Sequence, residues 1–203
     1  ATMLFTCDLH AYKDAVLTEQ EKHEILISSQ AQLQRYAKSL NKLMHNLNIT
    51  APQRVLYVSG MLLSMQPVVD IHNTKIQDGL MPEDLKGIQT ESKRDGVQIV
   101  NQIKEFLNAR DIPLDKQNLM LASFSEISKD AQRDEKTQLD KEVAKLIDGE
   151  ASTNKQIFTF IYHNIFLSID AMAGHLDIMG EMYSEFLKYA LGDGKEIGIV
   201  LTP

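Results

Sequence analysis

The feature that most constrains this chain is a leucine repeat near its N-terminus. Leucines recur every seven residues at Leu26, Leu33, Leu40 and Leu47. Seven residues make nearly two helical turns, so the repeat predicts one apolar stripe along about 28 residues, or about 42 Å of helix. Thr18 and Glu21 precede it with the spacing of a capping box, which marks a helix start. Such a stripe suits a coiled-coil partner or the chain's own core, and the neighbouring apolar segments favour the core.

Further start and stop signals predict three more helices in the first two thirds of the chain. Thr50-Ala51-Pro52-Gln53 indicates the start of a helix that continues to about residue 66, because proline is tolerated in a first turn. Apolar residues at helical spacing predict a helix from Val97 to just before Asp111. Residues 114–128 follow as another helix, on which we expect three side chains to point inward: Leu119, Met120 and Phe124.

The last third of the chain has the most apolar segments. Residues 157–172 carry large side chains all round, which is typical of a helix at the centre of a bundle, and Ser152 or Thr153 is expected to cap it. Residues 177–190 form a predicted amphipathic helix that ends at the glycines of 192–194. Its apolar side consists of Ile178, Met179, Met182, Tyr183, Phe186 and Leu187.

Two polar stretches separate these helices. Residues 78–96 contain three glycines, Gly79, Gly87 and Gly96, and one proline, Pro82. They are predicted to be a loop with a short helical turn. Residues 129–141 alternate in charge, which is typical of a solvated helix face or a linker. We expect no function from the second stretch.

The character of the sequence changes at its end. Residues 196–201 are largely apolar and rich in β-branched side chains, and they form the one strand that the sequence predicts. A lone strand leaves backbone groups unpaired, so we expect its sheet to lie beyond residue 203. The predicted fold is therefore all-α, a multi-helix bundle with a long N-terminal helix and a short C-terminal extended segment. In domain terms, residues 1–195 are a helical accessory domain and residues 196–203 are the first strand of an adjoining domain.

Composition and motifs narrow the chemistry. The single cysteine, Cys7, favours a reducing, cytoplasmic setting, and no segment is long and apolar enough to suggest a membrane span. A net charge of −7 argues against DNA binding by the chain as a whole. The six histidines form no metal-binding pair, and no phosphate-binding glycine loop occurs. We therefore expect neither a metal site nor a catalytic residue.

A family resemblance enters at the C-terminal end. The segments that carry it are Leu176-Asp177-Ile178-Met179-Gly180-Glu181-Met182-Tyr183-Ser184-Glu185-Phe186-Leu187-Lys188-Tyr189-Ala190 and Gly192-Asp193-Gly194-Lys195-Glu196-Ile197-Gly198-Ile199-Val200-Leu201-Thr202-Pro203. They resemble the stretch that leads into the catalytic domain of adenine-specific DNA methyltransferases of restriction-modification systems. Both type I modification subunits and related single-chain enzymes have such a stretch. A looser likeness extends upstream over residues 58–65 and 103–107.

The resemblance implies a role for the chain's last two residues. In the family this strand ends in Thr-Pro at the mouth of the S-adenosylmethionine pocket, so Thr202 and Pro203 are the implied cofactor-binding residues of an incomplete pocket. The family's cofactor loop and its Asn-Pro-Pro-Tyr or Asp-Pro-Pro-Phe tetrapeptide, which hold the methyl donor and the flipped adenine, are absent from this sequence. The implied partners are an adjoining methyltransferase domain and, through that protein, DNA. The chain alone is expected to need no cofactor.

Two alternatives stay open from the sequence. The first is a free-standing helical interaction module that dimerises through the 26–47 stripe. The second is a small helical enzyme whose site would use His175 or Glu185.

Overall fold

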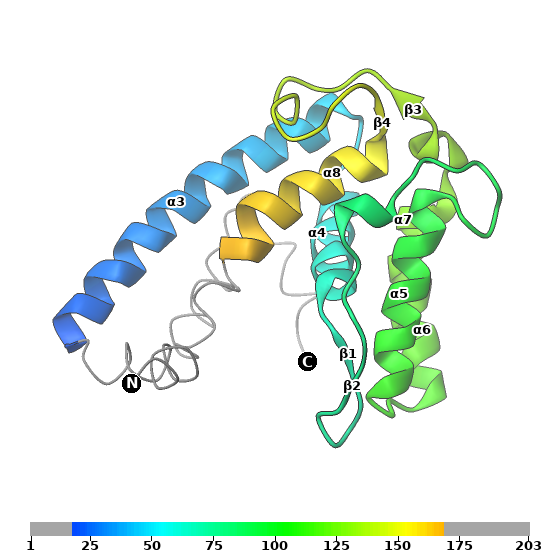
Figure 1. Cartoon of the computed structure of the whole chain (residues 1–203), viewed down its shortest axis with the longest axis horizontal. Helices are drawn as coiled ribbons and strands as arrows, with labels where there is room; N and C mark the ends of the chain where they lie inside the picture. The colour runs from blue at the N-terminus through cyan, green and yellow to red at the C-terminus, as the bar shows by residue number, and fades with distance from the viewer. Residues whose placement is uncertain (1–17, 169–203) are drawn as a thin grey trace, which may run out of the picture.

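The computed structural model describes residues 18–168, and Figure 1 shows their arrangement. Thr202 and Pro203, the extended segment 196–203 and the predicted helix 177–190 lie outside the described residues. The helical elements are α3 (Glu19–Asn46), α4 (Ala51–Met65), η1 (Pro82–Asp84), α5 (Asp95–Ala109), α6 (Leu114–Phe124), α7 (Glu126–Lys129), η2 (Ala131–Asp134), α8 (Thr153–Ile161) and η3 (Tyr162–Phe166). The strands are β1 (Val68–Val69), β2 (Lys75–Gln77), β3 (Lys136–Thr137) and β4 (Ala151–Ser152).

The two predicted helix starts near the N-terminus are confirmed. The Thr18 hydroxyl accepts a hydrogen bond from the Glu21 amide at 3.1 Å and caps α3, which is 28 residues long. At α4 the Gln53 side chain accepts from the Thr50 amide at 3.1 Å, and Pro52 lies in the first turn. Each cap satisfies an amide that the helix itself leaves without a partner.

The arrangement of the helices follows from where their apolar faces lie. In Figure 1, α8 runs alongside α3 in the opposite direction, and α5 and α6 form a neighbouring pair. Between the two pairs, α4 contacts α5, α6, α7 and α8. The chain thus folds around α4, whose interior-facing side is buried almost without interruption from Tyr57 to Met65.

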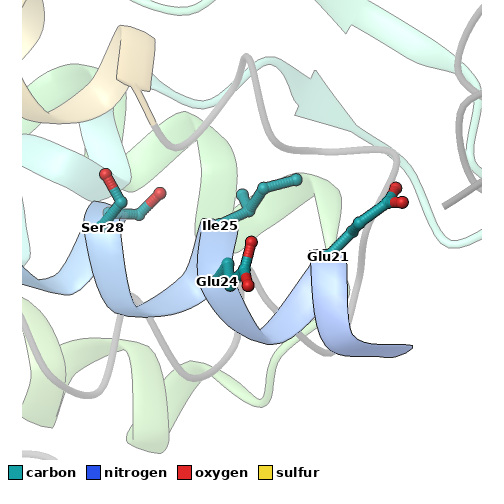
Figure 2. A pocket seen from close by; sticks show the side chains of 5 residues that line it. Glu21, Glu24, Ile25 and Ser28 are labelled. Atoms are coloured by element: carbon teal, nitrogen blue, oxygen red, sulfur yellow. The ribbon is translucent and has the colours of Figure 1, made fainter. Parts of the chain in front are cut away.

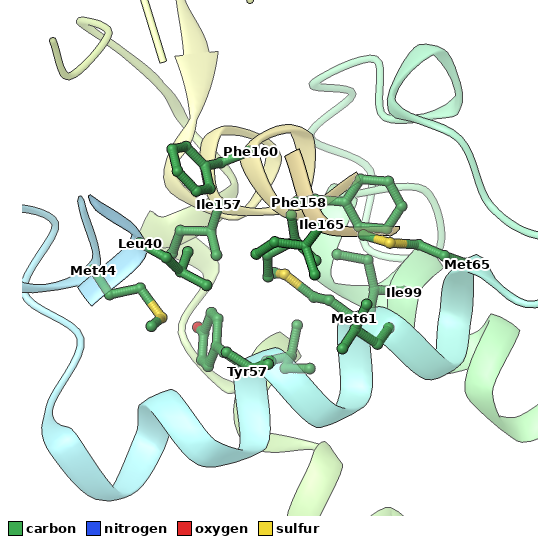
Figure 3. Packing of buried hydrophobic residues seen from close by; sticks show 14 of the residues in the cluster. Leu40, Met44, Tyr57, Met61, Met65, Ile99, Ile157, Phe158, Phe160 and Ile165 are labelled. Carbon is green, nitrogen blue, oxygen red and sulfur yellow. The ribbon is translucent and has the colours of Figure 1, made fainter. Parts of the chain in front are cut away.

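The core is a single apolar cluster with contributions from every long helix. Figure 3 shows Leu40 and Met44 of α3 facing Tyr57 and Met61 of α4, with side chains of α8 and η3 above them. Within the leucine stripe, Leu33 and Leu40 are buried and Leu47 is partly buried. The C-terminal part of the stripe therefore belongs to the chain's own core.

The described residues are mostly helical, as predicted, but they are not all-α. β1 pairs with β2 and β3 pairs with β4, both antiparallel, as two small two-stranded sheets. Each strand is only two or three residues long, too short for an alternating pattern to mark it in the sequence. The hairpin of β1 and β2 returns to α4 at Gly79, where a Cβ would lie 1.9 Å from the Met65 carbonyl oxygen.

The segment 114–128 departs from expectation in its continuity and in one side-chain placement. That segment is broken at Ser125 into α6 and α7, and Leu119 is 74% exposed rather than inward. Phe124 is buried and Met120 is partly buried, as predicted. The covered face of α6 consists of Gln117, Met120, Leu121 and Phe124, which follow one another at helical spacing, and Leu119 lies outside that face in solvent. Among residues 18–168, no helix is both long and apolar enough to cross a membrane.

The contrast between Phe124 and Leu119 supplies a test of the fold. Phe124→Ala should lower the free energy of unfolding by about 3–5 kcal/mol, because it removes a buried ring from the core. Leu119→Ala, on the same helix, should change it by no more than about 0.5 kcal/mol. Urea unfolding followed by circular dichroism measures both. Equal losses for the two variants would contradict this packing of α6.

Candidate functional site

The most concentrated chemistry in the described residues is a buried polar cluster, which we call the Asp134 network. Its members are Arg94, Asp95, Asp134, Ser152 and Asn154. All five residues are at most 7% exposed, and three are fully buried. Polar groups buried together in this way must satisfy one another, because water cannot reach them.

Asp134 is the centre of the network. Its Oδ1 accepts hydrogen bonds from the Gly96 amide at 2.8 Å and from Asn154 Nδ2 at 2.7 Å, while Oδ2 accepts from Arg94 Nη1 at 2.6 Å. The Gly96 amide is one of the four that the N-terminus of α5 leaves without a helical partner. The helix end, an amide and a guanidinium therefore all stabilise the ionised carboxylate.

Arg94 connects this interior charge to the surface. Its Nη2 and Nε donate to Glu91 Oε1 at 2.9 Å and Oε2 at 3.0 Å, a two-bond pairing, and Nη2 also donates to the Ser128 carbonyl at 2.8 Å. The hydrogen bonds to Glu91, together with those to Asp134, raise the pKa of Arg94 above its ordinary range. Arg94 in turn lowers the pKa of the exposed Glu91 carboxyl by donating to it.

Asp95 joins the network to the start of α8. Its Oδ2 accepts from the Ser152 hydroxyl at 2.6 Å, and its Oδ1 accepts from the Gly87 amide at 3.1 Å. Ser152 accepts at the same time from the Lys155 amide at 3.0 Å and so caps α8, which makes it the capping residue of the two candidates, Ser152 and Thr153. Burial raises the pKa of the Asp95 carboxyl, and the nearby Asp134 charge adds to that effect, while the bonds from Ser152 and Gly87 oppose it.

Gly96 is required by the geometry of the network. A Cβ at this position would lie 2.7 Å from the Ile127 carbonyl oxygen, 2.9 Å from Asn154 Nδ2 and 3.1 Å from Asp134 Oδ2. Asn154 bridges the same groups, donating to the Ile127 carbonyl at 3.0 Å as well as to Asp134. Its own Oδ1 is buried and has no hydrogen-bond partner among the described residues.

A second polar cluster surrounds Tyr57, which is fully buried in the core. Arg133 Nη1 donates to the Tyr57 hydroxyl at 2.8 Å, and the guanidinium carbon lies 5.6 Å from the ring centroid. Arg133 Nη2 also donates to Gln53 Oε1 at 3.2 Å. Burial raises the pKa of Tyr57 to about 12, against the opposing effect of Arg133. Tyr57 therefore stays a neutral phenol whose oxygen accepts from Arg133.

An open hollow lies elsewhere, on the N-terminal half of α3 (Figure 2). It measures about 430 Å³, and its described lining consists of Glu21, Glu24, Ile25, Ser28 and Ser29. Two exposed carboxylates beside hydroxyls do not make a metal site. No group of three or more histidine, cysteine, aspartate or glutamate side chains within residues 18–168 is placed to hold a metal ion.

The structure corrects one interpretation of the sequence. The sequence predicts that residues 129–141 are solvated, yet they contain Asp134, which is fully buried and accepts three hydrogen bonds. Asp130 and Asp140 stand in the same charged run, and no local pattern distinguishes Asp134 from them. Ser152 is the one residue of the Asp134 network that the sequence singles out, and it does so as a candidate helix cap. The implied cofactor residues Thr202 and Pro203, with His175 and Glu185, lie outside the described residues.

Comparison with known proteins adds no relative. No protein-family model matches the chain, and no curated protein or solved structure matches it either. What the described residues define is a mostly helical domain whose interior is held by an ionic network.

The first prediction from the network concerns its central charge. Asp134→Ala should lower the free energy of unfolding by about 3–5 kcal/mol, because it leaves the buried Arg94 guanidinium without one partner and two buried donors without an acceptor. Glu135→Ala, at the exposed neighbour, is the matched control and should change stability by at most about 0.5 kcal/mol. Urea titration measures both, and a loss for Asp134→Ala no larger than for the control would refute the network's role.

The second prediction concerns the pH dependence that Asp95 imposes. Its pKa is higher in the folded state than in the unfolded chain, so the folded state binds the proton more tightly. This contribution to stability is present below about pH 4 and is lost as the pH rises through the folded-state pKa. Asp95→Asn keeps an acceptor for Gly87 and a partner for Ser152 but removes the ionisation. The variant should therefore gain stability relative to the native chain as the pH rises from about 4.

Urea unfolding at a series of pH values tests this difference. Asp148→Asn, at an exposed position, is the control and should show no such divergence from the native chain. A native chain that gains stability over Asp95→Asn as the pH rises would mean that the Asp95 carboxyl is favoured, not penalised, in its charged form.

Proposed function

We propose that this chain is a helical accessory region of an adenine-specific DNA methyltransferase of a restriction-modification system. The observation that carries the proposal is the resemblance of residues 176–203 to the segment that leads into the catalytic domain of that family. In this role the chain supports or links the catalytic domain, which methylates DNA with S-adenosylmethionine as the methyl donor.

The polar contacts inside the described domain support the proposal that it has a structural role. Its concentrated polar groups bond to one another: Asp134 to Arg94, Asp95 to Ser152, and Tyr57 to Arg133. Such groups contribute to a stable, well-specified interior rather than to chemistry on a substrate. The net charge of −7 further suggests that contact with DNA phosphates comes from the adjoining domain. Thr202 and Pro203 then contribute to the cofactor pocket only when that domain completes it.

The proposal makes a direct biochemical prediction. The isolated chain should give no measurable heat on titration with S-adenosylmethionine and should transfer no methyl group to DNA. The longer protein encoded by the reading frame continued past the Pro203 codon should contain an Asn-Pro-Pro-Tyr type tetrapeptide. That protein should methylate adenine in DNA, measured with tritiated S-adenosylmethionine. Micromolar binding of S-adenosylmethionine by the isolated chain, or absence of the tetrapeptide from the longer protein, would refute the proposal.

The same assay can test the supporting role itself. In the longer protein, Asp134→Ala should reduce methyl transfer as the temperature is raised, since it weakens the helical domain on which the catalytic domain rests. Glu135→Ala should leave the temperature profile unchanged. Identical profiles for the two variants would show that methylation does not depend on this domain.

The alternative is a free-standing interaction module that pairs through the long helix. One observation favours it: Ile27 of α3 is 52% exposed, and the open hollow lies on the same half of the helix. The surface left for pairing is the part before Leu33, because Leu33 and Leu40 are buried in the chain's own core. Sedimentation velocity decides between the two, since a monomer at every concentration argues against self-association.

A further inference from the structure

The dipeptide Asp-Gly occurs three times among the described residues, and its surroundings differ at each place. The pairs are Asp78-Gly79, Asp95-Gly96 and Asp148-Gly149. An aspartate in such a pair can react with its own backbone, because glycine has no side chain to keep the next amide nitrogen away from the aspartate carboxyl carbon. The reaction is intramolecular, so it depends on whether the structure lets the two atoms meet.

In Asp95-Gly96 both reacting groups are held apart. Asp95 is fully buried, and its carboxylate accepts from the Ser152 hydroxyl at 2.6 Å and from the Gly87 amide at 3.1 Å. The Gly96 amide donates to Asp134 Oδ1 at 2.8 Å, so the nitrogen that would attack is already bonded to another carboxylate. Reaction here requires the Asp134 network to open.

In Asp78-Gly79 the backbone is fixed from both sides. The Asp78 carbonyl, which belongs to the peptide bond between the two residues, accepts from Gln102 Nε2 at 3.0 Å. Lys75 Nζ donates to the Asp78 carboxylate at 2.6 Å, and Gly79 lies so close to Met65 that a Cβ would overlap its carbonyl oxygen. The peptide cannot turn toward the carboxyl carbon without breaking these contacts.

Asp148-Gly149 has none of these restraints. The pair lies in the coil between β3 and β4, and both residues are exposed (Figure 1). Within residues 18–168, neither the Asp148 carboxylate nor the Gly149 amide takes part in a hydrogen bond or an ion pair. Gly149 has a φ of 77°, and a Cβ built on it would meet no atom within 4 Å. The two reacting groups therefore give up no partner and have open space around them.

We propose that Asp148 is a site of spontaneous isomerisation to isoaspartate. The Gly149 amide nitrogen attacks Cγ of the neutral Asp148 carboxyl, and the new N–Cγ bond closes a five-membered succinimide. The amide hydrogen and the carboxyl hydroxyl leave together as water. Water then adds back at either ring carbonyl carbon. Cleavage of the N–Cγ bond restores aspartate, whereas cleavage of the original peptide C–N bond leaves the main chain running through Cβ and Cγ.

The modification falls just ahead of a buried part of the fold. β4 begins at Ala151, and Ser152, which caps α8 and donates to Asp95, follows it. Isoaspartate adds one carbon to the main chain three residues before Ala151, in coil that is exposed from Asp148 to Glu150. This inference does not depend on the proposed function, because it concerns only the chemistry of this chain's own backbone.

Peptide mapping of the aged, folded chain tests the proposal. The chain is held at 37 °C and about pH 5, where part of an ordinary carboxyl is neutral and can lose its hydroxyl as water. After digestion at the same pH, isomeric peptides of equal mass are separated by chromatography and identified by electron-transfer fragmentation. We expect isoaspartate to accumulate at Asp148 at least several-fold faster than at Asp78 or Asp95. In water enriched in oxygen-18, the Asp148 peptide should also take up the label each time the ring reopens.

Two controls separate the effect of the structure from that of the dipeptide. In urea, which removes the restraints, Asp78 and Asp95 should isomerise about as fast as Asp148. Asp148→Glu should abolish both signals at this position, because a six-membered ring closes far more slowly, and the exposed side chain leaves the fold unchanged. Equal rates at the three sites in the folded chain would overturn the proposal. So would an Asp148 rate that rises in urea as much as the rates at the other two sites.

Discussion

The carboxylate of Asp134 lies where α5, α8 and the segment after α7 meet, and it carries a negative charge into a site that water does not reach. Taking such an ion out of water costs several kcal/mol, so the charge persists only if the surrounding structure supplies partners in fixed positions. Those partners come from the segment before α5, from the first turn of α5 and from the first turn of α8. If any of these segments moved, a buried charge or donor would lose its partner. The network therefore fixes the positions of α5, α8 and the segment after α7 relative to one another.

Two carboxylates, Asp134 and Asp95, are buried close together because their bonding partners differ. Asp134 receives the guanidinium of Arg94, whereas Asp95 receives only a hydroxyl and an amide. The cation is thus assigned to one carboxylate, and the pKa of the other rises through burial and repulsion. Arg94 is also held by the exposed Glu91, so the charge of the interior is balanced partly from the surface. This unequal sharing gives the domain its own dependence on pH.

Features set by neighbouring residues could be predicted from the sequence, and features set by distant residues could not. The start of α3 at Thr18, the start of α4 at Thr50 and the cap at Ser152 all rest on side chains within three residues of the amides they bind. Asp134, by contrast, bonds to Arg94 and Asn154, which are 40 and 20 residues away. Leu119 was wrongly placed because helical spacing says that a face is apolar but not whether a neighbour covers it. The candidate cofactor residues rest on resemblance alone, because a strand end acquires a binding role only from the sheet around it.

The same distinction bears on where function can reside in this chain. Inside the domain, donors and acceptors are matched almost completely, and Ser59 and Asn154 carry the two buried side-chain atoms without partners among the described residues. A matched interior has little capacity to bind anything further, since a ligand would have to break existing bonds to form its own. The hollow on the N-terminal half of α3 is instead open, and its described lining has Ile25 as its one apolar residue. The buried polar bonds instead hold the helices in fixed positions, because a shift of one element would leave a buried donor or acceptor without its partner.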